Sequence, residues 1–260
     1  MRKGFGYLIS IVMLTAALTV VGFAQSTNCG ATDYQCKITN ALKQIAANPN
    51  DIEAYYSLAS AYQDSGKRPD AISAINKYIA LKPGKTDYLA DAYFLRGNAN
   101  RDNGSLDLAI ADYNTALSYK PSMATIYMNR GLVRYRQSDY VRAIADLSKA
   151  GEIDPKESEV YYNRGFVYDK KGDTAKAIVD YDKYISMNSA EPAKLADGYS
   201  RRGVVYFDLN DLTQALNDLS MAIRLSPETA LFYTQRAKVY RKQGKTALAT
   251  ADEEKAAALK

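Results

Sequence analysis

Histidine, the side chain most often used for acid–base chemistry, is absent from this chain of 260 residues. Without it the chain cannot form a Ser-His-Asp or Cys-His pair, a histidine-ligated zinc site or an HExxH helix. Aspartate and glutamate are plentiful, but they are spread over repetitive helical surfaces, and no two of them stand out as an acid and a base. We therefore expect a protein that is not an enzyme and that uses no cofactor and no bound metal.

Two Gly-Lys-Thr tripeptides, at residues 84–86 and 244–246, match the end of a phosphate-binding loop. The complete loop needs another glycine five residues before each tripeptide, where the chain has Ile79 and Val239. We interpret both tripeptides as turns.

The first 24 residues have the three parts of a secretory signal. Arg2 and Lys3 precede an almost uncharged run, residues 7–24, which ends in small residues at positions 22 and 24. We predict a signal peptide over 1–24, cleaved after Ala24, with a second possible cleavage after Ser26, and hence an exported protein, periplasmic or extracellular. The alternative is an uncleaved membrane anchor, because a run of 18 residues is at the lower limit of what spans a bilayer. Contact with a membrane is expected only in that case.

The two cysteines, Cys29 and Cys36, are seven positions apart and follow this signal directly. In an oxidising compartment such a pair favours one disulfide, which would attach the N-terminal segment to the first helix. Two thiols alone supply too few ligands for a metal ion.

The charge of the chain argues against nucleic acid as a partner. The formal net charge is +5, and removal of Arg2 and Lys3 with the signal lowers it by two. The remaining charge is too small and too evenly spread to bind a phosphate backbone.

A pattern repeats six times after residue 51, with successive spacings of 38, 34, 34, 38 and 34 residues. Each copy has a small residue in its first helix, at Ala59, Gly97, Gly131, Gly165, Gly203 and Ala237. A tyrosine stands four residues before each of these, at Tyr55, Tyr93, Tyr127, Tyr161, Tyr199 and Tyr233. An alanine stands twelve residues after each, at Ala71, Ala109, Ala143, Ala177, Ala215 and Ala249. The small residue and the alanine allow two helices to approach closely, so each copy predicts a helical hairpin that must stack on its neighbours.

This pattern resembles the tetratricopeptide repeat family, whose units are 34 residues long. The resemblance covers residues 52–260 and implies an all-α fold, a right-handed α-solenoid of six antiparallel hairpins. The units are expected at about residues 52–85, 90–123, 124–157, 158–191, 196–229 and 230–260. Residues 25–51 precede them, with the cysteine pair and a capping helix over 33–47.

The two 38-residue spacings indicate a duplication. Lys77-Tyr78-Ile79 recurs 106 residues later as Lys183-Tyr184-Ile185. This recurrence indicates that the array consists of a block of three hairpins that is present twice. The four extra residues are expected to lengthen the loops before units two and five. At the end of the array, Glu253 stands where the other units have Ile75, Tyr113, Leu147, Tyr181 and Leu219, as a polar cap requires.

An arginine and an aspartate occur together in five of the six units. The arginines are Arg96, Arg130, Arg164, Arg202 and Arg236, and the aspartates are Asp112, Asp146, Asp180, Asp218 and Asp252. Unit one lacks both and has Leu58 and Ala74. Because the two residues appear and disappear together, we predict a structural ion pair within each hairpin. The rival interpretation is a basic ladder for anionic ligands.

The inner face of the solenoid, lined by the first helix of each hairpin, is the expected binding surface. Its candidate residues are Tyr56, Phe94, Asn98, Met128, Leu132, Tyr135, Tyr162, Phe166 and Phe207. The middle of this groove is apolar and its ends are polar, which suits a peptide with hydrophobic anchors. The alternative is that Phe94, Met128, Tyr162 and Phe166 only stack between adjacent hairpins.

Family members that clamp a terminal carboxylate use a lysine where this chain has Phe94, so we do not expect that mode. The resulting hypothesis is a non-catalytic exported adaptor for a protein or peptide partner. The alternative is a structural subunit packed permanently in an envelope complex or a homo-oligomer.

Overall fold

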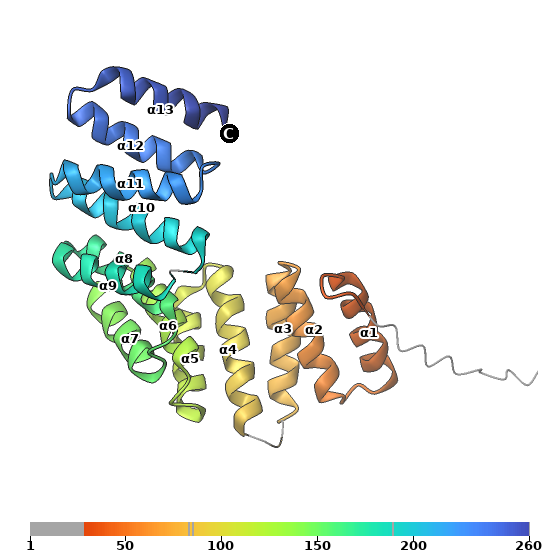
Figure 1. Ribbon diagram of the computed structural model, residues 1–260. Coiled ribbons are helices and arrows are strands. Elements are labelled where there is room, and N and C mark those ends of the chain that lie inside the picture. The colour runs from red at the N-terminus through yellow and green to blue at the C-terminus, as the bar shows by residue number, and fades with distance from the viewer. Residues whose placement is uncertain (1–28, 83, 85, 189, 260) are drawn as a thin grey trace, which may run out of the picture.

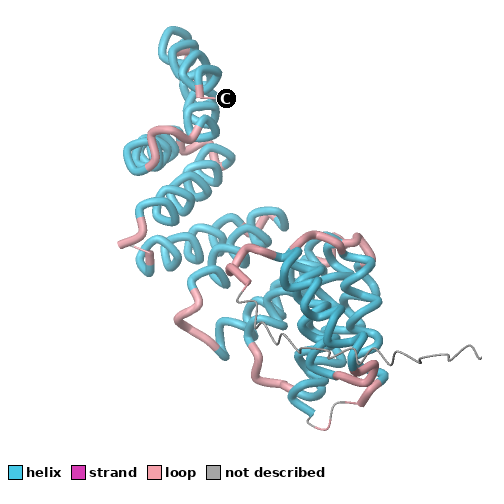
Figure 2. Tube along the Cα trace, turned by 90° about the vertical axis from the view of Figure 1, so that its right-hand side faces the viewer, coloured by secondary structure: helices cyan, strands magenta, loops and turns pink. Residues whose placement is uncertain are grey.

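The computed structural model describes residues 29–82, 84, 86–188 and 190–259 of the chain (Figure 1). The described residues form thirteen α-helices and no strand, so the predicted all-α solenoid is confirmed (Figure 2). The predicted signal peptide lies outside them. Within the described part of the chain, no helix has the length and apolarity needed to cross a membrane.

One single helix precedes six helical hairpins. This helix is α1 (Tyr34–Ala47). The hairpins are α2 (Ile52–Asp64) with α3 (Arg68–Ala80), α4 (Thr86–Asp102) with α5 (Leu106–Tyr119), α6 (Ala124–Arg136) with α7 (Tyr140–Ile153), α8 (Ser158–Lys171) with α9 (Thr174–Met187), α10 (Pro192–Asp208) with α11 (Leu212–Leu225), and α12 (Ala230–Lys242) with α13 (Thr246–Ala258).

The extra residues of units two and five form helix, so the expectation of longer loops there is wrong. Helices α4 and α10 each have 17 residues, whereas the other helices have 13 or 14. Four residues are about one helical turn. Pro192 starts α10 at a position where the missing N–H has no cost. Both first helices are therefore extended at their N-terminal ends.

Each hairpin closes over the small residue of its first helix. A Cβ atom added to Gly131 would lie 3.1 Å from the carbonyl oxygen of Ala143, on the facing helix. The turn that follows needs a positive φ, which Gly66, Gly104, Gly172 and Gly244 supply and which Ser138 and Asn210 also adopt. The sequence spacing of small residue, turn and alanine thus sets the shape of the hairpin.

A second contact joins each hairpin to the next. A large residue of the second helix shares a core cluster with a valine of the following first helix. The pairs are Tyr113 with Val133, Leu147 with Val167, Tyr181 with Val205, and Leu219 with Val239. The hydrophobic core therefore runs along the stack and crosses every one of these joints.

The two ends of the stack differ from its interior. At the N-terminal end, α1 buries Ile38 and Ala41 in the core cluster of the first hairpin, and a disulfide joins Cys29 to Cys36. At the other end, the carboxylate of Glu253 is 43% exposed and pairs with Arg241. A single helix and a surface ion pair thus occupy the places where further hairpins would stack.

The first helices lie on the inside of the curved stack (Figure 1). Each first helix contacts the next one along the array, from α2 and α4 to α10 and α12. Among the described residues, no second helix contacts another second helix. Helices α2, α4, α6, α8, α10 and α12 therefore line the concave face.

Candidate functional site

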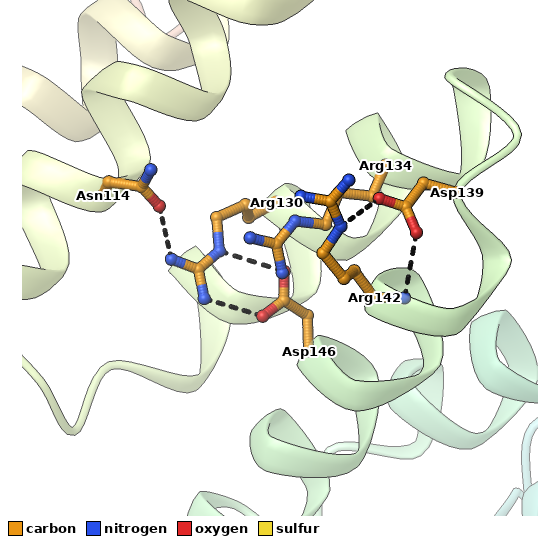
Figure 3. Close-up of polar contacts among 6 residues, drawn as sticks. All are labelled: Asn114, Arg130, Arg134, Asp139, Arg142 and Asp146. Carbon is orange, nitrogen blue, oxygen red and sulfur yellow. Dashed lines mark hydrogen bonds and ion pairs between the residues drawn. The ribbon is translucent and has the colours of Figure 1, made fainter.

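The five arginines lie against the aspartates of their own hairpins. Arg130 donates from Nε to Asp146 Oδ2 at 2.9 Å and from Nη2 to Oδ1 at 2.7 Å (Figure 3). The same two-bond arrangement joins Arg96 to Asp112, Arg164 to Asp180, Arg202 to Asp218, and Arg236 to Asp252. Because each guanidinium faces a carboxylate, these arginines do not form a free basic ladder.

Each of these arginines also reaches the preceding hairpin. Arg130 donates from Nη1 to Oδ1 of Asn114 at 2.6 Å (Figure 3). The other acceptors are Asn76, Ser148, Asp182 and Ser220. The sequence contains a signal for this bond, since the residue 17 positions after each small residue always carries a side-chain oxygen. The pairs are thus structural and bind two hairpins together.

The nine candidate residues of the concave face are all half-buried. The rings of Tyr135 and Phe166, from successive first helices, lie 5.1 Å apart. Tyr56 and Phe94 instead pack on tyrosines of second helices. Stacking between hairpins therefore accounts for part of the aromatic surface, as one interpretation of the sequence proposed.

The remaining candidates are also engaged within the fold. Asn98 Oδ1 accepts bonds from the hydroxyl of Tyr113 at 2.8 Å and from Asn129 at 3.3 Å. Met128 packs against the core around Leu147, and Phe207 packs against the core around Leu219. Leu132 lies half-buried on α6.

The middle of the concave face is not a purely apolar groove, so that expectation is wrong. The guanidinium of Arg201 lies 5.0 Å from the ring centre of Phe166, and its Nε donates to the hydroxyl of Tyr162 at 2.9 Å. Lys170 lies 5.4 Å from the same Phe166 ring. The two rings are therefore covered by cations in the middle of the array.

Two hollows open on the concave face, towards its two ends. The C-terminal hollow, of about 210 Å³, lies between α10, α11 and α12, and its lining includes Val204, Phe207, Leu231, Thr234 and Lys238. The N-terminal hollow, of about 150 Å³, lies between α2, α3 and α4 and is lined by Glu53, Tyr56, Tyr78, Tyr88 and Asp91. Of these lining residues, Tyr56 and Phe207 are among the nine candidates named from the sequence, and Val204, Thr234 and Lys238 also lie at positions that the repeat pattern places on the inner face.

Two family models match the chain. The model described as "TPR repeat" matches residues 97–138, 131–172 and 195–244, and the model described as "Tetratricopeptide repeat" matches residues 52–85 and 158–191. Together these matches cover more than half of the chain. The chain belongs to the tetratricopeptide repeat family. The resemblance predicted from the repeated residues is thereby confirmed.

A curated relative and several solved structures are similar to this tetratricopeptide repeat (TPR) chain over part of its length. Protein O-mannosyl-transferase TMTC1 of Mus musculus is 30% identical over 112 residues, which are 43% of this chain and only 12% of that relative. The structure of the APC/C hetero-tetramer Cut9-Hcn1 has a TM-score of 0.67 at 17% identity, over 88% of this chain and 44% of that one. YrrB, described as a TPR protein with an unusual peptide-binding site, has a TM-score of 0.58 at 20% identity, over 74% of this chain and 95% of its own. At such identities the two structures show the fold alone.

The N-terminal hollow of this TPR array is acidic. Asp91 binds Lys120 at 2.8 Å, whereas Glu53 forms no hydrogen bond or ion pair with any described residue. Burial raises the pKa of Tyr78 to about 12, and the negative charge of Glu53 adds to the effect. Burial likewise raises the pKa of Tyr56, with Asp91 as a further cause. The hydroxyl groups of Tyr56 and Tyr78 thus stay protonated in a negative potential.

Proposed function

We propose that this chain is an exported, non-catalytic adaptor that holds a protein or peptide partner on the concave face of its TPR array. The two hollows at the ends of that face carry the proposal, because they leave apolar and acidic side chains open between helices. TPR arrays in general bind proteins, and YrrB is an example described as having a peptide-binding site. An extended peptide could contact both hollows and the rings between them.

Export is proposed from the N-terminal sequence and supported by the disulfide. The charged start, apolar run and small residues of 1–24 form a secretory signal, and the bond between Cys29 and Cys36 suits an oxidising compartment. Mass spectrometry of the chain purified from its native source should give an N-terminus at Gln25. An intact Met1 would favour the membrane-anchored alternative.

A non-catalytic role is proposed because the chain has no histidine. The match to the O-mannosyl-transferase TMTC1 covers only 12% of that protein, so we do not extend its named activity to this chain. The shared stretch is proposed to be repeat structure.

Crosslinking and capture of partners from the native source tests the adaptor role. We expect Phe207→Ser with Leu231→Ser to reduce partner recovery, because both side chains line the C-terminal hollow. Val141→Ser, at an exposed position on α7, is the control and should leave recovery unchanged. Equal partner recovery with the wild type, the Phe207→Ser/Leu231→Ser double variant and the Val141→Ser control would reject binding through this hollow.

Light scattering on the purified mature chain separates the adaptor from the structural subunit. The adaptor is expected to be monomeric without its partner. A stable oligomer that the Phe207 and Leu231 substitutions dissociate would instead show that the face packs permanently against a second copy.

A further inference from the structure

The N-terminal hollow combines three aromatic rings with two carboxylates. Tyr56 and Tyr78 have ring centres 5.3 Å apart with the planes inclined at 53°, and Tyr88 completes the aromatic lining. Glu53 and Asp91 supply the charges. Ring faces and carboxylates both attract cations, and a hollow of about 150 Å³ fits a small cationic group.

Tyr78 has an unused hydrogen-bonding group in this hollow. The residue is only 2% exposed, and its hydroxyl makes no hydrogen bond to any described residue. This oxygen is not among the described side-chain atoms that are both shut off from solvent and unpaired, so it faces the open space of the hollow. A ligand with an N–H group would give the Tyr78 oxygen a donor.

The negative charge of the hollow is only partly balanced. The ammonium group of Lys120 neutralises Asp91, and Glu53 has no such partner among the described residues. One negative charge is therefore left on the exposed side chain of Glu53, at the rim of the hollow, where it can attract a cation.

The duplicated block contains a second copy of this arrangement. Glu159, Tyr162, Tyr184 and Asp197 stand 106 residues after Glu53, Tyr56, Tyr78 and Asp91. Tyr184 is also only 2% exposed, with a hydroxyl that bonds to no described residue. The four shared residues thus occupy the same places on α8, α9 and α10.

The two copies differ in the cations that the chain itself provides. Lys194 and Arg201 of the second copy correspond to Tyr88 and Leu95 of the first. Arg201 donates to the hydroxyl of Tyr162, and the charge of Lys194 opposes the effect of burial, which raises the pKa of Glu159. The second copy therefore has cationic side chains of its own at two positions where the first copy has uncharged residues.

We propose that the N-terminal hollow binds a lysine ammonium group of the partner protein. In the second copy, cationic side chains of the chain itself supply the positive charge. The proposal rests on the adaptor function and names the chemistry of one of its contacts. A primary ammonium fits better than a quaternary one, because only the primary group can donate to Glu53 and to the Tyr78 hydroxyl. In the second copy, the ammonium group of Lys194 pairs with Glu191 at 3.1 Å and places a positive charge close enough to act on Glu159.

Tyrosine ring signals of the full mature chain, followed by NMR, provide the test. The probe is N-acetyl-lysine methylamide, and the uncharged control probe is N-acetyl-norleucine methylamide. The lysine probe should give a saturable shift of the Tyr56 and Tyr78 signals that the norleucine probe does not give. Equal effects of the two probes, or no shift at either ring, would overturn the site.

Substitutions and a third probe locate the contacts. We expect Glu53→Gln to weaken binding of the lysine probe about fivefold by removing the charge, and Tyr78→Phe to weaken it about twofold to fivefold. Glu159→Gln, the same change in the second copy, is the matched control and should have no effect. Unaltered binding of the lysine probe to the Glu53→Gln variant would contradict the proposal. The third probe is N-acetyl-trimethyl-lysine methylamide, and if it bound as strongly as the lysine probe, the preference for a primary ammonium group would be wrong.

The outcomes separate this site from the adaptor function. If the lysine probe fails while the Phe207 and Leu231 substitutions still abolish partner capture, only the lysine site is rejected. If capture is unaffected by those substitutions but is lost in Glu53→Gln, the lysine site is retained and the C-terminal hollow is rejected.

Discussion

The arginine–aspartate pairs show how one position in the fold can be filled in two ways. Five hairpins have the ion pair, and the first has Leu58 and Ala74, each 5% exposed. The ion pair loses hydration energy on burial and recovers it only when both partners are present. The apolar pair avoids this loss, so the two partners must change together.

Substitution of the pair in the fourth hairpin tests this coupling. Asp180→Ala should cost about 3 kcal/mol, because it leaves the half-buried Arg164 without its carboxylate. Arg164→Leu combined with Asp180→Ala reproduces the first hairpin and should cost less than Asp180→Ala alone. Urea unfolding measures both free energies.

Glu152→Ala serves as the surface control for that experiment. Glu152 is 67% exposed and, among the described residues, pairs only with Lys149, so its removal should change stability by less than about 0.5 kcal/mol. Costs that simply add in the double variant would show that Arg164 and Asp180 are not coupled.

The partner of each arginine could be predicted from sequence because both residues vary together across the six units. The bond to the preceding hairpin was not predicted, because its acceptor changes between asparagine, serine and aspartate. A repeated chemical group is harder to detect than a repeated residue. The contacts of Arg201 could not be predicted for a different reason: only the fifth unit has an arginine at this position, so no repetition draws attention to it.

At the scale of the helices, two glycines illustrate opposite effects of the same substitution. Gly131 faces α7 so closely that a Cβ atom would lie 3.1 Å from a backbone oxygen and 3.1 Å from Leu147. Gly151, within α7, would make only an ordinary contact of 3.4 Å with Val160. Packing therefore dominates at the first position, and helix propensity dominates at the second.

We expect Gly131→Ala to lower stability by about 1–3 kcal/mol, since the hairpin must separate. Gly151→Ala should raise stability by about 0.5–1 kcal/mol, because alanine restricts the unfolded chain at little cost in the helix. Thermal and urea unfolding of the two variants give the signs. A destabilised Gly151→Ala variant would contradict the argument from contact distances.

The N-terminal extensions of α4 and α10 could not be predicted from the sequence. Prolines follow the ends of four helices, at Pro49, Pro121, Pro155 and Pro227, whereas Pro69 and Pro192 lie at the starts of α3 and α10. Proline is compatible with both positions, so the four extra residues could equally belong to a loop or to a helical turn. The choice is made by packing against neighbouring hairpins, which single-unit patterns do not describe.

For the whole molecule, buried tyrosines link stability to alkaline pH. Burial raises the pKa values of Tyr113, Tyr181 and Tyr184, and raises that of Tyr78 to about 12 from an ordinary 10.0. The unfolded chain thus loses these protons first. The stabilisation is complete below about pH 10 and is lost as the pH rises towards the folded-state pKa values.

Tyr78→Phe should reduce this pH dependence. Between pH 10 and about 12, the variant should lose less stability than the wild type, because it has one fewer tyrosine to ionise. Near pH 7 the two proteins should be similar, since the Tyr78 hydroxyl bonds to no described residue. Urea unfolding at several pH values measures both effects, and a large loss of stability at pH 7 would mean that the hydroxyl has a structural partner.

The fold as a whole could be predicted from sequence much better than the hollows. The hairpins repeat six times, so each small residue and alanine confirms the others. The N-terminal hollow occurs once with its present lining, and Tyr78 comes from a second helix, where tyrosines usually pack in the core. Its only signal is the difference between the two blocks at Tyr88 and Lys194.

The valine contacts that join the hairpins also restrict how such an array can evolve. Every joint from α5 to α12 brings a valine onto a large residue of the helix before it, so these joints are nearly interchangeable. A further copy of the block, inserted at one of them by gene duplication, would meet a fitting surface on both sides. A copy stacked on α13 would bring its valine onto the exposed carboxylate of Glu253. The lineage can therefore lengthen this array from within more readily than at its C-terminal helix.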